Sequence, residues 1–536
     1  MRNVKLNVQK TKRIIFFKIK AAVSPRKNTY ISNLIDIYKN EYWIKRMNRE
    51  RDEAALKNRD RIYKKIIEYG ILGVIVFSPL PAASVHEWSI LIIEIAVLVM
   101  MAAYVLMKER PQNSELISLS LKWPRYLFVG LFIFIFIQII PLPNFIVKIF
   151  SPNIHSFQNI FSSDFSKIKF MSLSLIPSHT LGEGLELLSY FLLGFLIVKT
   201  VTRRRQFMRI FYVLVSMGIF EALYGMFELY NKNPRILFYK KIYGLDTVSG
   251  TFVNRNHLSG YLEMIIPLAI GLIIARIDFF SLAGLRWREK LLRLSQKGFS
   301  TNLILTGGII AMSLAIIFSK SRSGVFLLVF AFILFFGLTV LYFGRVRHQQ
   351  KGVKNFLKVS FLIIILISLY VGIDATIERF ALEKLLQEGR PAVWSNVIPI
   401  VGDFPLFGTG LGTFGSVYPA YEESRMPGHL SHAHNDFLEY LSELGAVGMI
   451  FLFGGIAFMV VSSFLIWQVR RHPQVKGLAL GGIVAIVVIL IHSITDFNLH
   501  IPANMVLFTV VLSLTAVTAF YKRSERNKSQ DSNLKK

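Results

Sequence analysis

Long apolar runs separated by short polar segments fill the chain from residue 66 to residue 521. A run of about 20 apolar residues is long enough to cross a bilayer as a helix. About twelve runs approach this length, so the pattern predicts an all-α polytopic membrane protein. The predicted spans are 66–82, 88–107, 126–141, 183–198, 210–230, 257–275, 302–318, 324–343, 359–373, 437–467, 477–494 and 504–521.

Basic residues concentrate in alternate loops between these spans, for example in "TVTRRRQFMR" at 200–209. With the N-terminus placed inside, about three quarters of the lysines and arginines fall in the two tails and the short inner loops. This positive-inside pattern predicts that both termini are cytoplasmic, and it attributes the net charge of +29 to topology and contact with anionic membrane lipids. No groove-reading or RNA-binding motif accompanies the charge, so nucleic acid is not an expected partner.

The same pattern divides the chain into three parts. Residues 1–65 form a basic cytoplasmic tail, whose helical stretch is either a solvated orientation signal or a helix on the membrane surface. Residues 66–521 form the transmembrane domain, and residues 522–536 form a tail with the composition of a disordered segment. The longest loop, 374–435, is expected to be structured and functional. The absence of cysteine excludes disulfides, thiolate metal sites and cysteine nucleophiles.

Five polar motifs fall on the predicted outer side of the spans. They are "GTFVNRNHLSG" (250–260), "SKSRSG" (319–324), "GRPAVWSNVIPIVGDFPLFGTGLGTFG" (389–415), "HLSHAHNDFLEYLSELGAVG" (429–448) and "TDFNLHIPAN" (495–504). Because all five belong to one face of the predicted bundle, we expect a functional site at the outer boundary between membrane and water.

Basic residues in these motifs are candidate anion ligands. Arg322 lies among small residues at the start of a helix, where the helix N-terminus and a guanidinium both favour phosphate. Arg255 and Arg390 also precede helices, and Lys320 either binds the same anion or reaches lipid phosphates. The G-x-G-x-x-G at 410–415 lacks the βαβ context of a dinucleotide site, and its composition predicts a tight loop with exposed amides.

The histidine motif allows three interpretations. His432, His434 and Asp436 stand at alternate positions, a spacing that can chelate a divalent ion. A neutral imidazole beside an acid also suits general-base catalysis. A helix that begins near Asn435 would instead use these residues as caps. That helix would carry a polar face of Asp436, Glu439, Tyr440 and Glu443. Further polar candidates lie in other motifs and inside predicted spans: His257, Asp496, Asn498, His500, Glu94, Glu221 and Glu263.

In this order, the motifs resemble the O-antigen ligase and polymerase superfamily of bacterial envelope enzymes. The resemblance rests on "SRSG" (321–324), on residues 389–414, on "HN" (434–435) followed by Gly445 and Gly448, and on "DFNLHIPAN" (496–504). It covers roughly residues 250–505 and departs at "NRN" (254–256), where the family pattern has "NPN". Arg255 is therefore a local feature that the family pattern does not support.

The resemblance implies a metal-independent, inverting glycosyltransferase of the GT-C type that needs no cofactor. It would lie in the bacterial inner membrane and act on the periplasmic face. Its donor would be a glycan on undecaprenyl pyrophosphate. Its acceptor would be a growing glycan for a polymerase, lipid A–core for a ligase, or a protein for an O-linked oligosaccharyltransferase, and these alternatives stay open at this point.

The resemblance also implies roles for individual residues. His434 would take the proton from the acceptor hydroxyl, with Asp436 as the second catalytic residue. The donor pyrophosphate would be bound by Arg322 and Arg390, and Arg255 and Lys320 are additional candidates from the sequence itself. The further site candidates are His432, Asn435, Glu439, His257 and His500.

Two other classes compete with a transferase. A transporter or flippase for lipid-linked glycans predicts inverted repeats and interrupted helices, and the sequence shows neither. A metal-dependent membrane hydrolase would use His432, His434 and Asp436 as metal ligands, and sensitivity to chelators would reveal it.

Overall fold

A computed structural model describes residues 25–111, 117, 120–154, 169–231, 234–242, 244–276, 297–342, 389–422, 430–470 and 472–521. The chain divides into two units, one of residues 1–63 and 107–109 and one of residues 64–106 and 110–536. Residues 25–63 of the smaller unit belong to α2 (Pro25–Phe77), whereas its residues 107–109 are not helical. Within this unit, the Asp60 carboxylate accepts hydrogen bonds from the backbone amides of Lys108 (3.2 Å) and Glu109 (2.8 Å).

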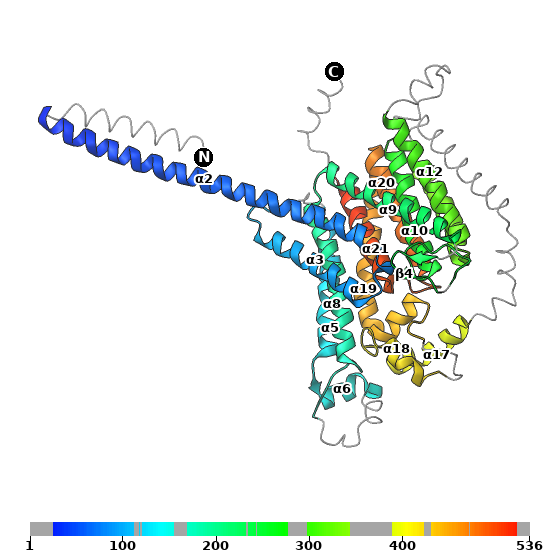
Figure 1. Cartoon of the computed structure of the whole chain (residues 1–536). Coiled ribbons are helices and arrows are strands. Elements are labelled where there is room, and N and C mark those ends of the chain that lie inside the picture. Colours follow the sequence, from blue (N-terminus) through cyan, green and yellow to red (C-terminus); the bar gives the residue numbers. More distant parts are fainter. Residues whose placement is uncertain are drawn as a thin grey trace, which may run out of the picture. The chain divides into compact units, whose positions relative to one another are not determined.

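The larger unit is a bundle of apolar helices (Figure 1). Ten helices among the described residues are long and apolar enough to cross a membrane, which confirms the predicted all-α polytopic class. Residues of the predicted span 66–82 form the end of α2 and the 3-10 turn η1 (Ala82–Ser84), and the predicted span 359–373 lies outside the described residues. The ten helices are α3 (Glu87–Leu106), α5 (Lys122–Ile139), α8 (Pro177–Thr200), α9 (Arg204–Leu229), α10 (Arg255–Ala275), α12 (Lys297–Phe318), α13 (Arg322–Tyr342), α19 (Asp436–Val469), α20 (Pro473–His492) and α21 (Pro502–Phe520).

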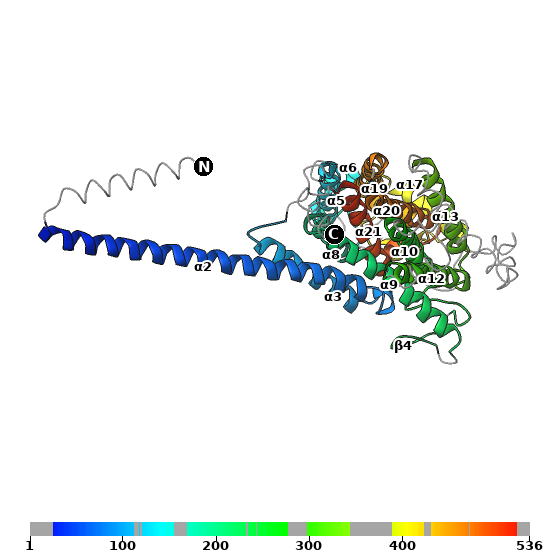
Figure 2. The ribbon, with the colours of Figure 1, turned by 90° about the horizontal axis from the view of Figure 1, so that it is seen from above.

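Helices α10, α20 and α21 form the centre of this bundle (Figure 2). The apolar stretches of α10 and α21 are completely buried, as is 78% of that of α20. Glycines allow the backbones of α10 and α20 to touch, because a Cβ on Gly271 would lie 2.6 Å from the carbonyl oxygen of Gly477. This close pair lies at the end of α10 and the start of α20, and a Cβ on Gly260, near the start of α10, would lie 3.1 Å from Ile489, near the end of α20.

Two long loops pack together at one end of the bundle. The first carries β1 (Leu142–Pro143), α6 (Asn144–Phe150) and β2 (Phe170–Met171), in which β1 and β2 pair antiparallel. The second carries α17 (Arg390–Asp403), α18 (Phe414–Val417) and the 3-10 turn η4 (Tyr418–Ala420). We call the described parts of both loops, residues 142–154, 169–176, 389–422 and 430–435, the loop layer. A separate hairpin of β3 (Arg235–Ile236) and β4 (Tyr239–Lys240) lies between α9 and α10.

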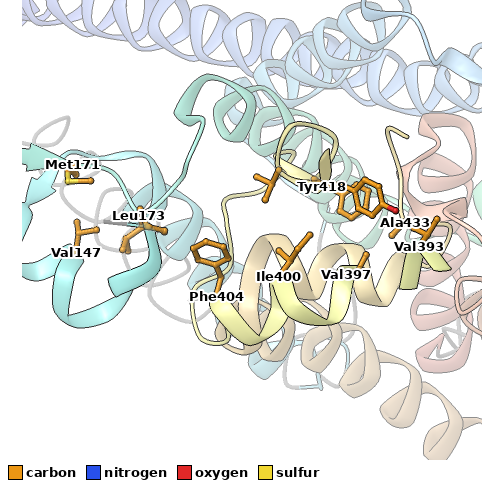
Figure 3. Packing of buried hydrophobic residues seen from close by; sticks show 12 residues of the cluster. Val147, Met171, Leu173, Val393, Val397, Ile400, Phe404, Tyr418 and Ala433 are labelled. Atoms are coloured by element: carbon orange, nitrogen blue, oxygen red, sulfur yellow. The ribbon is translucent and has the colours of Figure 1, made fainter. Parts of the chain in front are cut away.

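The loop layer has its own apolar core (Figure 3). Side chains of α17 meet side chains from the first loop and from α18 in one buried cluster. Polar contacts add to it, because Asn153 donates to the carbonyl oxygen of Asp403 (3.0 Å) and Tyr421 donates to the Asp403 carboxylate (2.7 Å). The cluster consists of Val147, Ile154, Met171, Leu173, Val393, Val397, Ile400, Phe404, Phe414, Val417, Tyr418 and Ala433.

Helix α19 is interrupted at Gly445, whose φ of 60° and ψ of −174° are not helical. The carbonyl oxygens freed before the break accept from the loop layer, Ser442 from the amide of Thr409 and Glu443 from that of Gly410, both at 2.9 Å. The amide of Ala446 donates to Pro405 (2.9 Å). The prediction that the amides of this loop are exposed is thus wrong for Thr409 and Gly410. These amides donate to carbonyl oxygens that the break in the helix leaves without helical partners. The sequence showed no sign of interrupted helices, and this interpretation is wrong for α19, which breaks at Gly445.

Candidate active site

Four helix starts surround the segment that links α20 to α21. Arg255, Arg322 and Arg390 are the first residues of α10, α13 and α17, and Asn435 caps the start of α19. The linking segment contains Asp496 and the 3-10 turn η5 (Asn498–His500). Because helix N-termini carry partial positive charge, this arrangement favours anionic groups in the segment and in any ligand beside it.

Asp496 is the centre of the first cluster. Its carboxylate is completely buried and accepts from Asn256 Nδ2 at 2.7 Å, while one nitrogen of the Arg390 guanidinium lies 3.4 Å away. His434 Nδ1 and His257 Nε2 lie 3.2 Å and 3.7 Å from its other oxygen. Burial alone would raise the pKa of Asp496, but the two imidazoles and the Arg390 charge outweigh it and hold that pKa well below its usual range. Asp496 is therefore a permanent carboxylate.

His434 is the part of this cluster that reaches solvent. Its side chain is 31% exposed, whereas that of His257 is 6% exposed. Since an ionised carboxylate can only accept, Nδ1 of His434 donates to Asp496, and the neutral ring carries its lone pair on Nε2. The residue has a φ of 51°, a conformation that costs energy outside glycine and marks a position that the surrounding structure enforces.

A second cluster forms around His500. Its Nδ1 lies 2.6 Å from an oxygen of the buried Asp436, and its Nε2 lies 3.5 Å from Glu439. The ring stacks on Tyr440 at 4.2 Å between centroids. Burial alone would lower the pKa of His500, but the carboxylates of Glu439, Asp436 and Glu443 raise it to about 10. His500 is thus a buried imidazolium that neutralises acids on the face of α19.

His432 and Phe497 connect the two clusters. His432 Nδ1 lies 2.8 Å from Glu439 Oε1, and its side chain is 30% exposed. Its ring stacks on Phe497 with centroids 4.2 Å apart, and the rings of His434 and His257 meet Phe497 edge to face at 4.9 Å and 4.5 Å. Phe497 therefore fixes the orientation of three imidazoles, two of which are open to solvent.

A third chain of contacts leads from inside the bundle to the arginine turn. Glu263 Oε2 lies 3.0 Å from Nδ1 of His492, and the His492 Nε2 lies 3.0 Å from the Ser323 hydroxyl. All of these groups are buried or half-buried, and Ser323 follows Arg322 directly. The contacts hold the start of α13 against the end of α20, four residues before Asp496.

Lys320 and Arg255 lie near a different carboxylate. Lys320 forms an ion pair with Asp246 (2.8 Å), a residue that is 66% exposed. The hydrogen bond from Lys320 lowers the pKa of Asp246, and the charge of Arg255 adds to this effect. Lys320 therefore pairs with an exposed carboxylate, whereas Arg390 contacts the buried carboxylate of Asp496.

Several predicted site residues thus come together, although in other pairs than expected. The carboxylate beside His434 is Asp496, while Asp436 contacts His500 and the amide of Leu499. Asn435 accepts from the amides of Phe437 (3.0 Å) and Leu438 (3.1 Å), as its capping interpretation expects. No group of three or more histidine, aspartate or glutamate side chains could hold a metal ion in the described part of the chain.

Sequence reasoning missed three parts of this arrangement. It named Asp496 without a role, and it did not name His492 or Asp246. A polar residue within a predicted span was the available signal for His492, because such residues are costly in a bilayer unless they bond to each other. Of the carboxylates in spans, Glu221 instead accepts from the amide and hydroxyl of Thr251, both at 2.9 Å.

The comparisons with known proteins address the segment that carries much of this site. Residues 307–453 match the family model described as O-antigen ligase. This O-antigen ligase region begins in α12, ends in α19, and includes Arg322, Arg390 and His434. The match confirms the resemblance to the O-antigen ligase and polymerase superfamily.

The O-antigen ligase region and the ten apolar helices together support a multi-pass membrane protein of the glycan ligase or polymerase kind. A search among curated proteins finds no match to the chain. Asp496, His492 and His500 lie beyond the matched region, yet their side chains contact residues within it, namely His434, Ser323 and Asp436.

Proposed function

We propose that the protein is an inverting, metal-independent glycosyltransferase of the bacterial inner membrane. It transfers a glycan from undecaprenyl pyrophosphate to an acceptor on the periplasmic face, as an O-antigen ligase or an O-antigen or exopolysaccharide polymerase. The basic inner loops support the orientation, in which both termini are cytoplasmic and the loop layer is periplasmic.

The observation that carries the proposal is the contact of His434 with Asp496. A buried carboxylate fixes the ring, sets the tautomer, and leaves Nε2 available on a side chain that is 31% exposed. A base of this kind must lie within hydrogen-bond reach of the proton that it removes, and the exposed edge of His434 meets that requirement for an acceptor at the loop layer. Asp496 also stabilises the imidazolium that forms after proton transfer.

In the reaction, the acceptor hydroxyl oxygen attacks the anomeric carbon from the face opposite the pyrophosphate. The new carbon–oxygen bond forms as the bond to the pyrophosphate breaks, and the proton passes to His434 Nε2. The electron pair of the broken bond stays on the oxygen of the leaving pyrophosphate, which remains attached to its lipid carrier. Inversion follows from this single displacement.

Arginines stabilise the charge that develops on the leaving group. Arg390 is 25% exposed and lies on the same carboxylate as His434, so base and cation are held in fixed relation. Arg322 starts α13 beside the contact of Ser323 with His492. Preorganised donors of this kind are worth on the order of 10²–10³-fold in rate each. The proposal therefore assigns no step to a metal ion.

The test uses purified full-length protein in liposomes with a single-repeat undecaprenyl-pyrophosphate glycan. Lipid A–core or a pilin-like protein is added in separate reactions, and products are read by gel and mass spectrometry, with and without EDTA. A ladder without added acceptor identifies a polymerase, and product only with lipid A–core identifies a ligase. Product only with protein identifies a protein oligosaccharyltransferase, and activity in EDTA supports metal independence.

A transporter or flippase is the second candidate, and the interruption of α19 at Gly445 is the observation that favours it. Loop-layer amides occupy the freed carbonyls at that break, so they are not presented to a substrate or ion. Movement of intact donor across the liposome membrane without any transfer, by folded protein with matched sugars, would replace the transferase proposal by this one.

A further inference from the structure

An apolar cavity of about 690 Å³ lies within the bundle, separate from the histidine clusters. It is lined by α5, α8, α19 and α21 and is partly open, and α3 contributes at one end. Its wall in the middle of the bundle consists of side chains such as Leu187, Leu452 and Phe508. A cavity of this composition in a membrane protein suits a hydrocarbon chain rather than a polar substrate.

Three cations line one end of this cavity, namely Arg110, Arg125 and Lys199. Arg110 lies over the ring of Tyr104 at 5.3 Å, and Lys199 lies over that of Phe195 at 5.9 Å. No carboxylate is among the described residues that line the cavity, and none pairs with these cations in the described part of the chain. Among the described residues, the cationic end therefore has no carboxylate counter-ion.

The cationic end lies away from the loop layer. Near the end of α5, Gln138 donates to the carbonyl oxygens of Phe407 (2.7 Å) and Glu443 (3.1 Å). Arg125 lies in the first turn of the same helix, at its other end. Helix α8 begins near Thr180, whose hydroxyl bonds to Ser174 of the loop layer, whereas Lys199 is in its last turn. The cations thus sit at the opposite membrane surface from the proposed donor site.

The cavity has the length of a lipid chain. It follows α8 from Lys199 to Leu187, and twelve residues of helix rise about 18 Å, or a little more than half of the hydrocarbon thickness of a bilayer. One acyl chain of a phospholipid spans about one leaflet, so its headgroup would lie at the cationic end while the chain occupies the apolar part. The far longer chain of a polyprenyl carrier does not match this depth.

We propose that this cavity binds an anionic glycerophospholipid from the leaflet opposite the loop layer. Arg110, Arg125 and Lys199 contact the headgroup phosphate, and one acyl chain fills the space between α5, α8, α19 and α21. Basic pockets between membrane helices bind anionic headgroups in this way. The lipid would contact four helices, of which α19 carries Asp436 and Glu439, and α21 directly follows the segment that contains Asp496 and His500.

The test measures binding of phosphatidylglycerol and phosphatidylcholine with identical chains to the full-length protein in detergent, by native mass spectrometry. We expect tighter binding of phosphatidylglycerol, and about 100-fold weaker binding in the triple variant R110Q/R125Q/K199Q. The matched control K122Q/R204Q/R205Q removes three exposed cations that do not line the cavity, and it should bind as the unchanged protein does. Leu452→Trp should block binding of both lipids by filling the cavity.

Three results would overturn this proposal. Equal binding of both lipids would show that charge plays no part. Equal loss in the triple variant and its control would show general surface attraction. Displacement of bound phosphatidylglycerol by a low concentration of undecaprenyl phosphate would assign the cavity to the donor's lipid carrier. Because binding is read without any transfer reaction, none of these results depends on the proposed function.

Discussion

Two imidazole–carboxylate pairs lie close together in this protein and differ in what they can do. In the first, His434 meets the buried Asp496 and keeps an exposed edge. In the second, His500 meets the buried Asp436 with Glu439 and Glu443 nearby, and its side chain is 10% exposed. One carboxylate orients a ring whose second nitrogen remains open, whereas several carboxylates around a closed ring convert it to a fixed cation.

The difference teaches that the pairing alone does not identify a base. Exposure of the second ring nitrogen and the number of nearby acids decide between chemistry and structural support. His432 tests the boundary, because it is as exposed as His434 but pairs with Glu439, which belongs to the His500 cluster. The predictions below separate the two pairs, beginning with the largest expected effect.

Replacement of His434 by alanine should lower the transfer rate by about 10²–10⁴-fold, because it removes the general base. The side chain is partly exposed, so the melting temperature in detergent should change little. His432→Ala is the matched control and should retain most activity. If the two variants exchanged these results, His432 would be the base and the comparison would have to be reversed.

Replacement of His500 by glutamine should act on stability. It leaves Asp436 and Glu439 buried without their cation, a change that costs about 3–5 kcal/mol of unfolding free energy. Thermal unfolding in detergent measures this loss. A second replacement, Asp436→Asn in the same chain, should recover part of it, and an unchanged melting temperature in His500→Gln would contradict the imidazolium assignment.

Replacement of Arg390 by alanine should lower the transfer rate by about 10²–10³-fold, because it removes a positive charge that would stabilise the leaving pyrophosphate. Lys320→Ala should lower it by less than about tenfold, because Lys320 pairs with the exposed Asp246, whereas Arg390 lies on the carboxylate that orients His434. Steady-state rates at saturating donor give the comparison. Equal losses in both variants would place Lys320 on the donor as well.

The pH dependence of stability should differ between the two pairs. The folded pKa of His500 is about 10, above its usual value near 6.5, so its contribution is complete below about pH 6.5 and disappears as pH rises through 10. Asp496 has a lowered pKa, so its contribution is present at neutral pH and disappears only in acid. Melting temperatures measured between pH 6 and pH 10.5 should fall with rising pH for the unchanged protein. In His500→Gln they should depend less on pH.

Replacement of Ser323 by alanine should have the smallest effect, a few-fold in rate and about 1 kcal/mol or less in stability. The change removes one hydrogen bond to His492 and leaves Arg322 in place. Rate and melting temperature measured on the same preparation check it. A loss as large as that of Arg390→Ala would mean that the contact with His492 positions Arg322 directly.

The fold followed from sequence because its signal is redundant along the chain. Apolar length and basic loops predicted about twelve spans, ten of which are long apolar helices in the described part of the chain, and the gathering of the five polar motifs at one end. The partner of His434 did not follow, because Asp436 is two residues away in sequence, whereas Asp496 comes from the distant segment that links α20 to α21. Local spacing cannot show that the start of α19 turns Asp436 inward, toward His500.

The interruption at Gly445 has a consequence for how such a protein can change during evolution. Residues 436–444 are continuous in sequence with a membrane helix, but the carbonyl oxygens of Ser442 and Glu443 at their end accept from amides of the loop layer. Mechanically, they belong to the loops, and so do the histidines that precede them. If His434 is the proposed base, substitutions in the loop layer can therefore change the direction of its exposed edge while the membrane bundle keeps its packing.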